Sequence, residues 1–224
     1  LRFDPRYVAV AERVASGDLG PPIYTVTRRS GPFHVGRAAA PWTTIPLFLS
    51  VHDLDVVQWI TGSRITRVQA EASSIKMADI GAPDAVVALL RLADGSVSIN
   101  EASWSLPSQL PLSAGDAYFS YIGTQGCAYV ELRDQNVKVF GGDPRYSSGS
   151  PKERREGLFW SPETAYQTEV LGVPSGIMMA QLDHFLSGVR DSRPLPITTT
   201  EARSAVEAAL AIDQALTTRQ AVEL

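Results

Sequence analysis

The sequence has little of what marks several classes of protein. Cys127 is the single cysteine in 224 residues, so no disulfide can form within the chain, and we expect a reducing, cytoplasmic setting. No apolar run reaches the length of a membrane-spanning helix. Basic residues are not clustered and the formal net charge is -4, which argues against a nucleic-acid or anionic-membrane surface. The remaining composition, 44% hydrophobic and 20% charged, predicts a globular chain with a real core.

The hydrophobic pattern predicts helices near both ends of the chain and strands in the middle. Apolar residues at helical spacing predict helices over residues 4–17, 44–62, 175–189 and 200–217. Runs rich in β-branched and aromatic residues predict strands at 23–27, 65–74, 84–92, 96–103, 118–123, 127–132, 137–140 and 220–224. Two segments follow neither period: residues 33–42 are predicted to be a loop, and residues 141–162 an exposed, flexible excursion.

The turns between the strands favour antiparallel pairing. Ala93-Asp-Gly-Ser96 and Gly123-Thr-Gln-Gly126 are tight-turn signals that predict hairpins. Strands grouped between helices predict a single α+β domain over residues 1–224, with an open, largely antiparallel or mixed sheet and helices packed on one face. We expect the other face to be apolar and covered by another domain or a second copy, to judge from Val87, Leu89, Ile99 and Trp104.

The helix predicted at 44–62 carries the most distinctive chemistry. Phe48, His52 and Asp55 lie three and four residues apart and therefore share one face, whereas Asp53 points elsewhere. A histidine with an acid one turn along can be a general acid or base whose tautomer the acid fixes. It can equally be a buried histidine hydrogen-bonded to its neighbour, and the residues alone leave both interpretations open. Adjacent acids on a helix diverge, so we expect no metal site.

Two other motifs give weaker indications of function. Gly17-Asp-Leu-Gly20 follows a predicted helix and lacks the spacing of a dinucleotide-binding loop, so the sequence shows no nucleotide-binding motif. Arg28 and Arg29 follow a predicted strand and suit an anionic ligand, but consecutive strand residues face opposite ways, so at most one points into a given pocket. For both arginines, pairing at the surface is the simpler expectation.

Several stretches together resemble the Gfo/Idh/MocA oxidoreductases, a family named for glucose-fructose oxidoreductase, inositol dehydrogenase and a rhizopine-catabolism protein. Each stretch alone is only weakly specific for the family, whereas the order and spacing of all of them are more specific. They are Arg2-Phe-Asp-Pro-Arg-Tyr7, Ser16-Gly-Asp-Leu-Gly20, His52-Asp-Leu-Asp55, Trp59-Ile-Thr-Gly62, the two turns at 93–96 and 123–126, Gln181-Leu-Asp-His-Phe185, and Arg193-Pro-Leu-Pro196 before an alanine-rich last helix.

The resemblance implies a two-domain enzyme of which this chain is the second domain. Members of the family pair an N-terminal Rossmann domain, which holds NAD or NADP, with an α+β domain that shapes the substrate site and commonly mediates oligomerisation. The resemblance therefore implies that the Rossmann domain is absent from this chain and that the isolated fragment is inactive. It also implies a small-molecule substrate, such as a sugar or cyclitol, and a homo-oligomer formed through the open sheet face.

The resemblance assigns roles by position. His52 matches the family's catalytic histidine, which takes the proton of a substrate hydroxyl. Where the family often has an aspartate four residues earlier, this chain has Phe48, which leaves Asp55 as the acid expected to orient His52. The resemblance also assigns Arg2 to the cofactor and five residues to the substrate: Arg29, Ser30, Trp42, Phe48 and Asp55. Because of Phe48, a non-catalytic ligand-sensing or dimerisation module of the same fold is the alternative.

Overall fold

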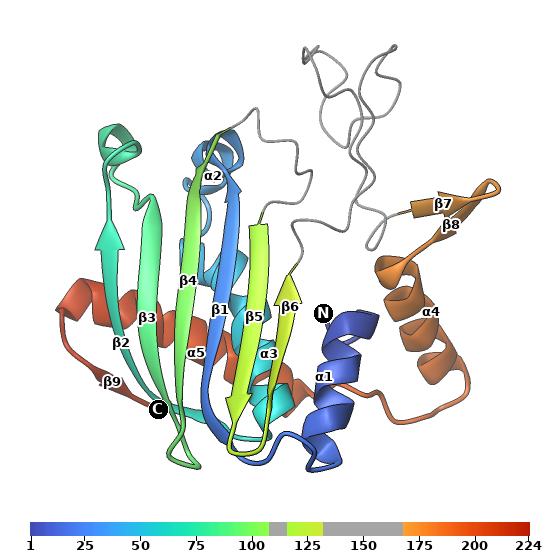
Figure 1. The fold of residues 1–224 in the computed structure, drawn as a ribbon. Helices are drawn as coiled ribbons and strands as arrows, with labels where there is room; N and C mark the ends of the chain where they lie inside the picture. Colours follow the sequence, from blue (N-terminus) through green and yellow to red (C-terminus); the bar gives the residue numbers. More distant parts are fainter. Residues whose placement is uncertain (108–115, 132–167) are drawn as a thin grey trace.

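The computed structural model of the chain describes residues 1–107, 116–131 and 168–224 (Figure 1). The predicted strand at 137–140 and the predicted excursion at 141–162 lie outside these residues. The elements follow one another as α1 (Pro5–Ala15), β1 (Pro22–Pro32), α2 (Phe33–Ala39), the π turn η1 (Pro46–Ser50), α3 (Val51–Thr61), β2 (Ile65–Ser73), the 3-10 turn η2 (Ala78–Ile80), β3 (Ala85–Leu92), β4 (Val97–Leu106), β5 (Asp116–Gly123), β6 (Cys127–Glu131), β7 (Thr168–Val170), β8 (Val173–Ser175), α4 (Ile177–Arg190), α5 (Thr199–Thr218) and β9 (Val222–Glu223).

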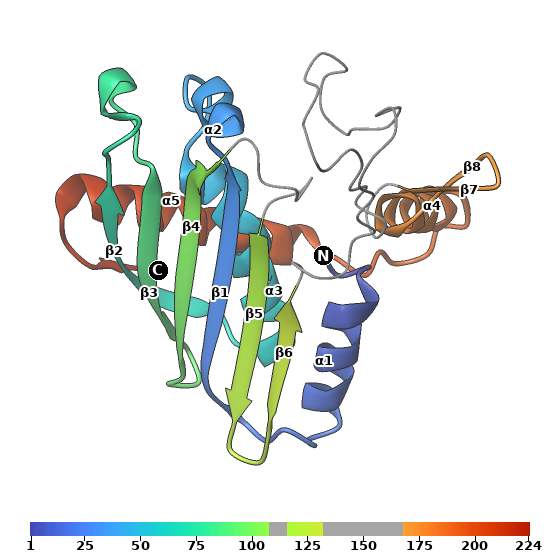
Figure 2. The same cartoon turned by 45° about the horizontal axis from the view of Figure 1, so that its top comes forward.

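The main sheet has seven strands in the order β6-β5-β1-β4-β3-β2-β9. Strands β1 and β4 run parallel, and the other neighbouring pairs are antiparallel. The tight turns at 93–96 and 123–126 join the hairpins β3–β4 and β5–β6, as predicted. Helices α3 and α5 lie on one face of the sheet and α1 lies beside β6 (Figures 1 and 2). The prediction of a mixed open sheet with helices on one face is confirmed.

The helix predictions are confirmed except between residues 33 and 42. That segment was predicted to be a loop, yet it holds α2, which is too short to show a helical period in its sequence. A contact with β4 explains why the helix forms. Gly36 packs so closely on Trp104 that an added Cβ would lie 2.3 Å from the Trp104 Cβ. Strand β1 is also longer than predicted, because its pairing with β4 and β5 carries it to Pro32.

A polar seam between β1 and β4 divides the interior into two apolar clusters. One cluster is formed mainly by β2, β3, β4, η1 and α5, and the other mainly by α1, α3, β5 and β6. Along the seam, Thr25 Oγ1 donates to Ser98 Oγ at 2.7 Å, and Asn100 Nδ2 donates to Thr27 Oγ1 at 2.9 Å. All four residues are buried, so the seam is held by hydrogen bonds rather than by apolar contact.

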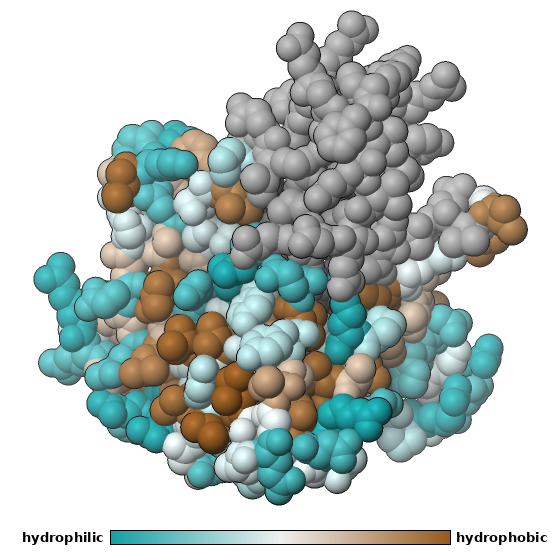
Figure 3. All heavy atoms as spheres, viewed as in Figure 1, coloured by the Kyte–Doolittle hydropathy of each residue, from teal (hydrophilic) through white to brown (hydrophobic). Residues whose placement is uncertain are grey.

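The sheet face without helices is apolar over its middle strands, as Figure 3 shows. Val87, Leu89 and Ile99 are 51%, 47% and 37% exposed, as predicted. The same prediction was wrong for Trp104, which is 1% exposed, because strand alternation places it with Asn100 on the helix-covered face. The open sheet face is therefore defined by Val87, Leu89 and Ile99.

The two C-terminal helices differ in how well they are covered. On α5, Ala205, Ala209 and Ile212 are buried, whereas Val206 and Leu210 are exposed. Helix α4 stands beyond α1, away from the sheet (Figures 1 and 2), and its exposed apolar residues are Met178, Met179, Leu182, Phe185, Leu186 and Val189. Within the described ranges, no helix is both long enough and apolar enough to span a bilayer.

Candidate active site

His52 lies in the first turn of α3, directly after the π turn η1. The π turn η1 begins at Pro46, and Thr44 Oγ1 accepts a hydrogen bond from the backbone N–H of Leu47. Helix α3 ends at Gly62, whose φ of 65° is left-handed. The side chain of His52 is exposed, whereas the next residue, Asp53, is buried. The interpretation of His52 as a histidine sealed in the core is therefore wrong, and the ring can meet a ligand.

The surroundings of His52 keep its imidazole neutral. Nearby protein atoms partly shield the ring from water, and this burial, together with the positive charge of Arg29, lowers the pKa of His52 to about 4. The charge of Asp55 opposes that shift. At neutral pH the imidazole is therefore unprotonated and able to accept a proton.

Asp55 forms an ion pair with Arg2. Its carboxylate accepts hydrogen bonds from Arg2 Nε at 3.0 Å and from Arg2 Nη2 at 2.6 Å. Arg2 Nη1 donates to Glu201 at 2.7 Å, and the guanidinium lies 5.5 Å from the centroid of the Trp59 ring. Among the described residues no hydrogen bond joins Asp55 to His52, so the acid acts on the histidine through its charge alone. Arg2 ties the start of the chain to α3 and α5, and its predicted contact with a cofactor stays a prediction.

Asp53 and Arg29 form a buried ion pair that the sequence did not reveal. Arg29 Nε and Nη2 donate to the two carboxylate oxygens at 3.0 and 2.8 Å, and the exposed side-chain fractions are 14% for Arg29 and 1% for Asp53. Burial raises the pKa of Asp53, and Arg29 opposes that rise. The expectation of surface pairing suits Arg28, which binds Asp116, but not Arg29. The alternation of β1, with Thr25 and Thr27 facing the helices, was the available signal.

Ser30 does not lie on the same side of the sheet as His52. It follows Arg29 on β1 and so turns to the opposite face of the sheet, where it accepts a hydrogen bond from Ser103 Oγ at 3.0 Å. Ser105 Oγ in turn donates to Ser103 at 3.0 Å. The structure thus separates Ser30 from the other predicted site residues.

Aromatic side chains gather around Phe48, in the turn that precedes His52. Phe48 lies one turn before His52, and its ring centroid is 5.7 Å from that of Trp42 and 5.8 Å from that of Trp104, both in edge contacts. Trp42 is 70% exposed and Trp104 is buried. The two predicted site residues Trp42 and Phe48 therefore lie together.

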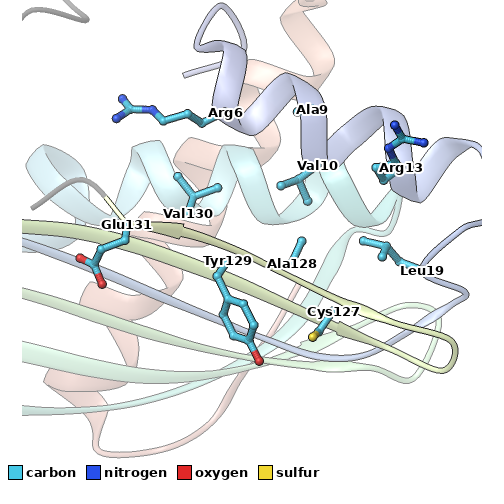
Figure 4. Close-up of a pocket in the computed structure, with 10 residues that line it drawn as sticks. All are labelled: Arg6, Ala9, Val10, Arg13, Leu19, Cys127, Ala128, Tyr129, Val130 and Glu131. Atoms are coloured by element: carbon cyan, nitrogen blue, oxygen red, sulfur yellow. The ribbon is translucent and has the colours of Figure 1, made fainter. Parts of the chain in front are cut away.

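A shallow groove of about 370 Å³ lies between α1 and β6, apart from His52 (Figure 4). Figure 4 shows Val10 and Val130 facing one another across the groove, while the ring of Tyr129 extends away from α1. None of the site residues described above lines it. In the part of the chain that the structure describes, no group of three or more His, Cys, Asp or Glu side chains is placed to hold a metal ion.

Comparisons with known proteins agree with this fold. Inositol 2-dehydrogenase 2 of Paenarthrobacter aurescens is 34% identical over 106 residues, 45% of this chain and 30% of that protein. The scyllo-inositol 2-dehydrogenase (NAD(+)) of Bacillus subtilis is 29% identical over 150 residues, 62% of this chain and 40% of that protein. The chain thus aligns with less than half of the length of these two relatives.

Solved structures match over nearly the whole chain. The crystal structure of scyllo-inositol dehydrogenase from Lactobacillus casei with bound NAD(H) and scyllo-inositol superposes with a TM-score of 0.71 at 18% identity, covering 99% of this chain and 62% of that one. A myo-inositol dehydrogenase from Corynebacterium glutamicum gives 0.70 at 21% identity, covering 100% and 62%. The model of the GFO/IDH/MocA C-terminal domain matches residues 7–129, more than half of the sequence, so this chain belongs to the GFO/IDH/MocA family and contains its C-terminal domain.

Proposed function

We propose that this chain is the substrate-binding domain of a cytoplasmic, nicotinamide-dependent dehydrogenase that oxidises a cyclitol or a sugar. The observation that carries the proposal is His52: an exposed imidazole, neutral at physiological pH, at the start of a helix anchored by two ion pairs. The relatives named as inositol dehydrogenases support the cyclitol class.

In the proposed reaction a secondary alcohol becomes a ketone. The O–H proton passes to the unprotonated nitrogen of His52. A nicotinamide bound by a neighbouring domain would supply the acceptor for the hydride that leaves the same carbon. His52 suits this step because its lowered pKa leaves a nitrogen lone pair available at neutral pH. The ion pairs Arg2–Asp55 and Arg29–Asp53 hold α3 and hence the position of the ring.

The described residues do not form a dinucleotide site of their own. The Gly17–Gly20 turn joins α1 to β1 rather than a strand to a helix, and the guanidinium of Arg2 is engaged by Asp55 and Glu201. We therefore assign the binding of NAD or NADP mainly to a Rossmann domain outside this chain. The exposed apolar residues of α4 suit a contact with such a domain.

The decisive experiment is His52→Ala in the full-length protein, assayed with NAD or NADP and scyllo- or myo-inositol. We expect kcat to fall about 10²- to 10⁴-fold, the usual contribution of a general base. His34→Ala, which changes an exposed histidine on α2, is the matched control and should keep activity. Near-normal turnover of His52→Ala would remove His52 from the mechanism.

A non-catalytic, ligand-sensing member of the same fold is the second candidate, favoured by Phe48 in place of an acid. Phe48 packs against Trp42 and Trp104, and this supports the candidate because a phenyl ring cannot relay a proton. This candidate predicts that the full-length protein binds a cyclitol or sugar tightly but turns over none of a broad panel with either NAD or NADP.

We further propose that a second copy of the chain covers the open sheet face. The exposed side chains of Val87, Leu89 and Ile99 give that face an apolar centre. Leu89→Glu should shift the protein to a smaller species in light scattering, whereas Val206→Glu, an exposed position on α5, should leave the mass unchanged. The same mass for both variants would contradict this interface.

A further inference from the structure

Trp42 presents a fixed aromatic surface to solvent. Its side chain is 70% exposed, which is unusual for so large an apolar group, yet it is not loose. The indole Nε1 donates to the backbone carbonyl of Ala38 at 3.1 Å, and the ring meets Phe48 edge-on at an interplanar angle of 76°. One face of the indole is thus held in a defined orientation toward solvent.

Phe48 and Trp104 support this surface from below. Phe48 is half-buried and contacts Trp42 on one side and Trp104 on the other, at 5.7 and 5.8 Å between ring centroids. Trp104 is 1% exposed and is itself packed against Gly36. The three rings therefore form a rigid series from the core to the surface, so that little conformational entropy is lost when a ligand contacts it.

Phe48 also links this series to the helical turn that carries the candidate proton acceptor. Phe48 lies four residues before His52, across the junction of η1 and α3, so both side chains project from the same side of the helix. On that side of the helix, a ligand at His52 has Phe48 one turn away and Trp42 in contact with Phe48. An aromatic surface offers no partner to a hydroxyl pressed against it, but it gains energy from covered C–H groups.

We propose that Trp42 and Phe48 form a stacking subsite for one face of a ring substrate, so that the site selects cyclitols or pyranoses that present C–H groups on that face. The inference rests on the proposed function and deepens it. A ring whose hydroxyls are all equatorial, as in scyllo-inositol, presents axial hydrogens on both faces, whereas an acyclic polyol such as mannitol has no such face.

The test uses the full-length protein with Trp42→Ala and the conservative variant Trp42→Phe. We expect Trp42→Ala to raise the KM for scyllo-inositol about tenfold with little change in kcat, and Trp42→Phe to restore most of the binding. Mannitol should bind weakly to all three proteins. Ile75→Ala, which shortens another highly exposed apolar side chain, should leave KM unchanged.

Titration of scyllo-inositol by calorimetry gives a readout that is independent of turnover. Weaker binding to Trp42→Ala, with normal binding to His52→Ala, supports the stacking subsite even if the protein turns over no cyclitol. Equal binding of scyllo-inositol to wild type and Trp42→Ala, or binding of mannitol as tight as that of scyllo-inositol, overturns the subsite. A loss of turnover confined to His52→Ala would then still support the proposed function.

Discussion

Replacing Arg29 by methionine tests whether the buried ion pair anchors α3. The wild-type guanidinium makes two hydrogen bonds to Asp53, and both side chains are largely withdrawn from solvent. Methionine keeps a long apolar side chain, so the substitution removes the charge and the hydrogen bonds with little loss of packing. Asp53 is then left buried without its counter-charge.

Removing one partner of a buried pair costs roughly 3–5 kcal/mol, because the remaining charge is not compensated. The cost should depend on pH in a known direction. Burial already raises the pKa of Asp53, and without Arg29 nothing described opposes that rise as strongly. When the pKa of a carboxyl is higher in the folded than in the unfolded protein, the folded protein loses stability as the pH increases. The variant should therefore be least destabilised near pH 5 and most destabilised near pH 8.

Urea unfolding followed by circular dichroism at both pH values measures the effect. Arg37→Met is the matched control: Arg37 also donates two hydrogen bonds to a single carboxylate, that of Asp79, at 2.9 and 2.8 Å, but both side chains are exposed. Solvent screens such a pair, so its removal should leave the unfolding midpoint nearly unchanged. Equal losses for the two variants, or a loss for Arg29→Met that does not vary with pH, would refute the reasoning.

Two further predictions concern His52 and Gly36. NMR titration of His52 should give a pKa near 4, and Arg29→Met should move it toward the ordinary value of 6.5 because a nearby positive charge is removed; an unchanged titration would contradict the assigned cause. Gly36→Ala should destabilise the protein by about 1–3 kcal/mol in thermal unfolding, since the new methyl group overlaps Trp104, although alanine is the better helix former. A stabilised Gly36→Ala variant would show that α2 can move away from β4 at little cost.

Local signals in the sequence were sufficient for most of the fold. The hairpin turns, the strand alternation at Val87 and Leu89, and the helical period around His52 each depend on neighbours in the chain, and each prediction is confirmed. The helix α2 was missed because it is stabilised by the close approach of Gly36 to Trp104, a contact between residues far apart in the sequence. Local pattern has no access to such a contact.

The candidate site was predicted less completely, for the same reason. The proximity of Phe48 to His52 follows from helical spacing, but the partners of Asp53 and Asp55 come from β1 and from the start of the chain. The family resemblance assigned both Arg29 and Ser30 to the substrate site, whereas a strand sends adjacent side chains to opposite faces.

The motif His52-Asp-Leu-Asp55 therefore has a different meaning in three dimensions from the one its spacing suggests. In the sequence it resembles a relay in which an acid orients a histidine. In the structure each acid is bound by an arginine from another segment, Asp53 by Arg29 and Asp55 by Arg2. The two acids join α3 to the sheet and to the start of the chain, and no described residue makes a hydrogen bond to His52. The imidazole is consequently held by the position of its helix, and its exposure leaves it available to a ligand.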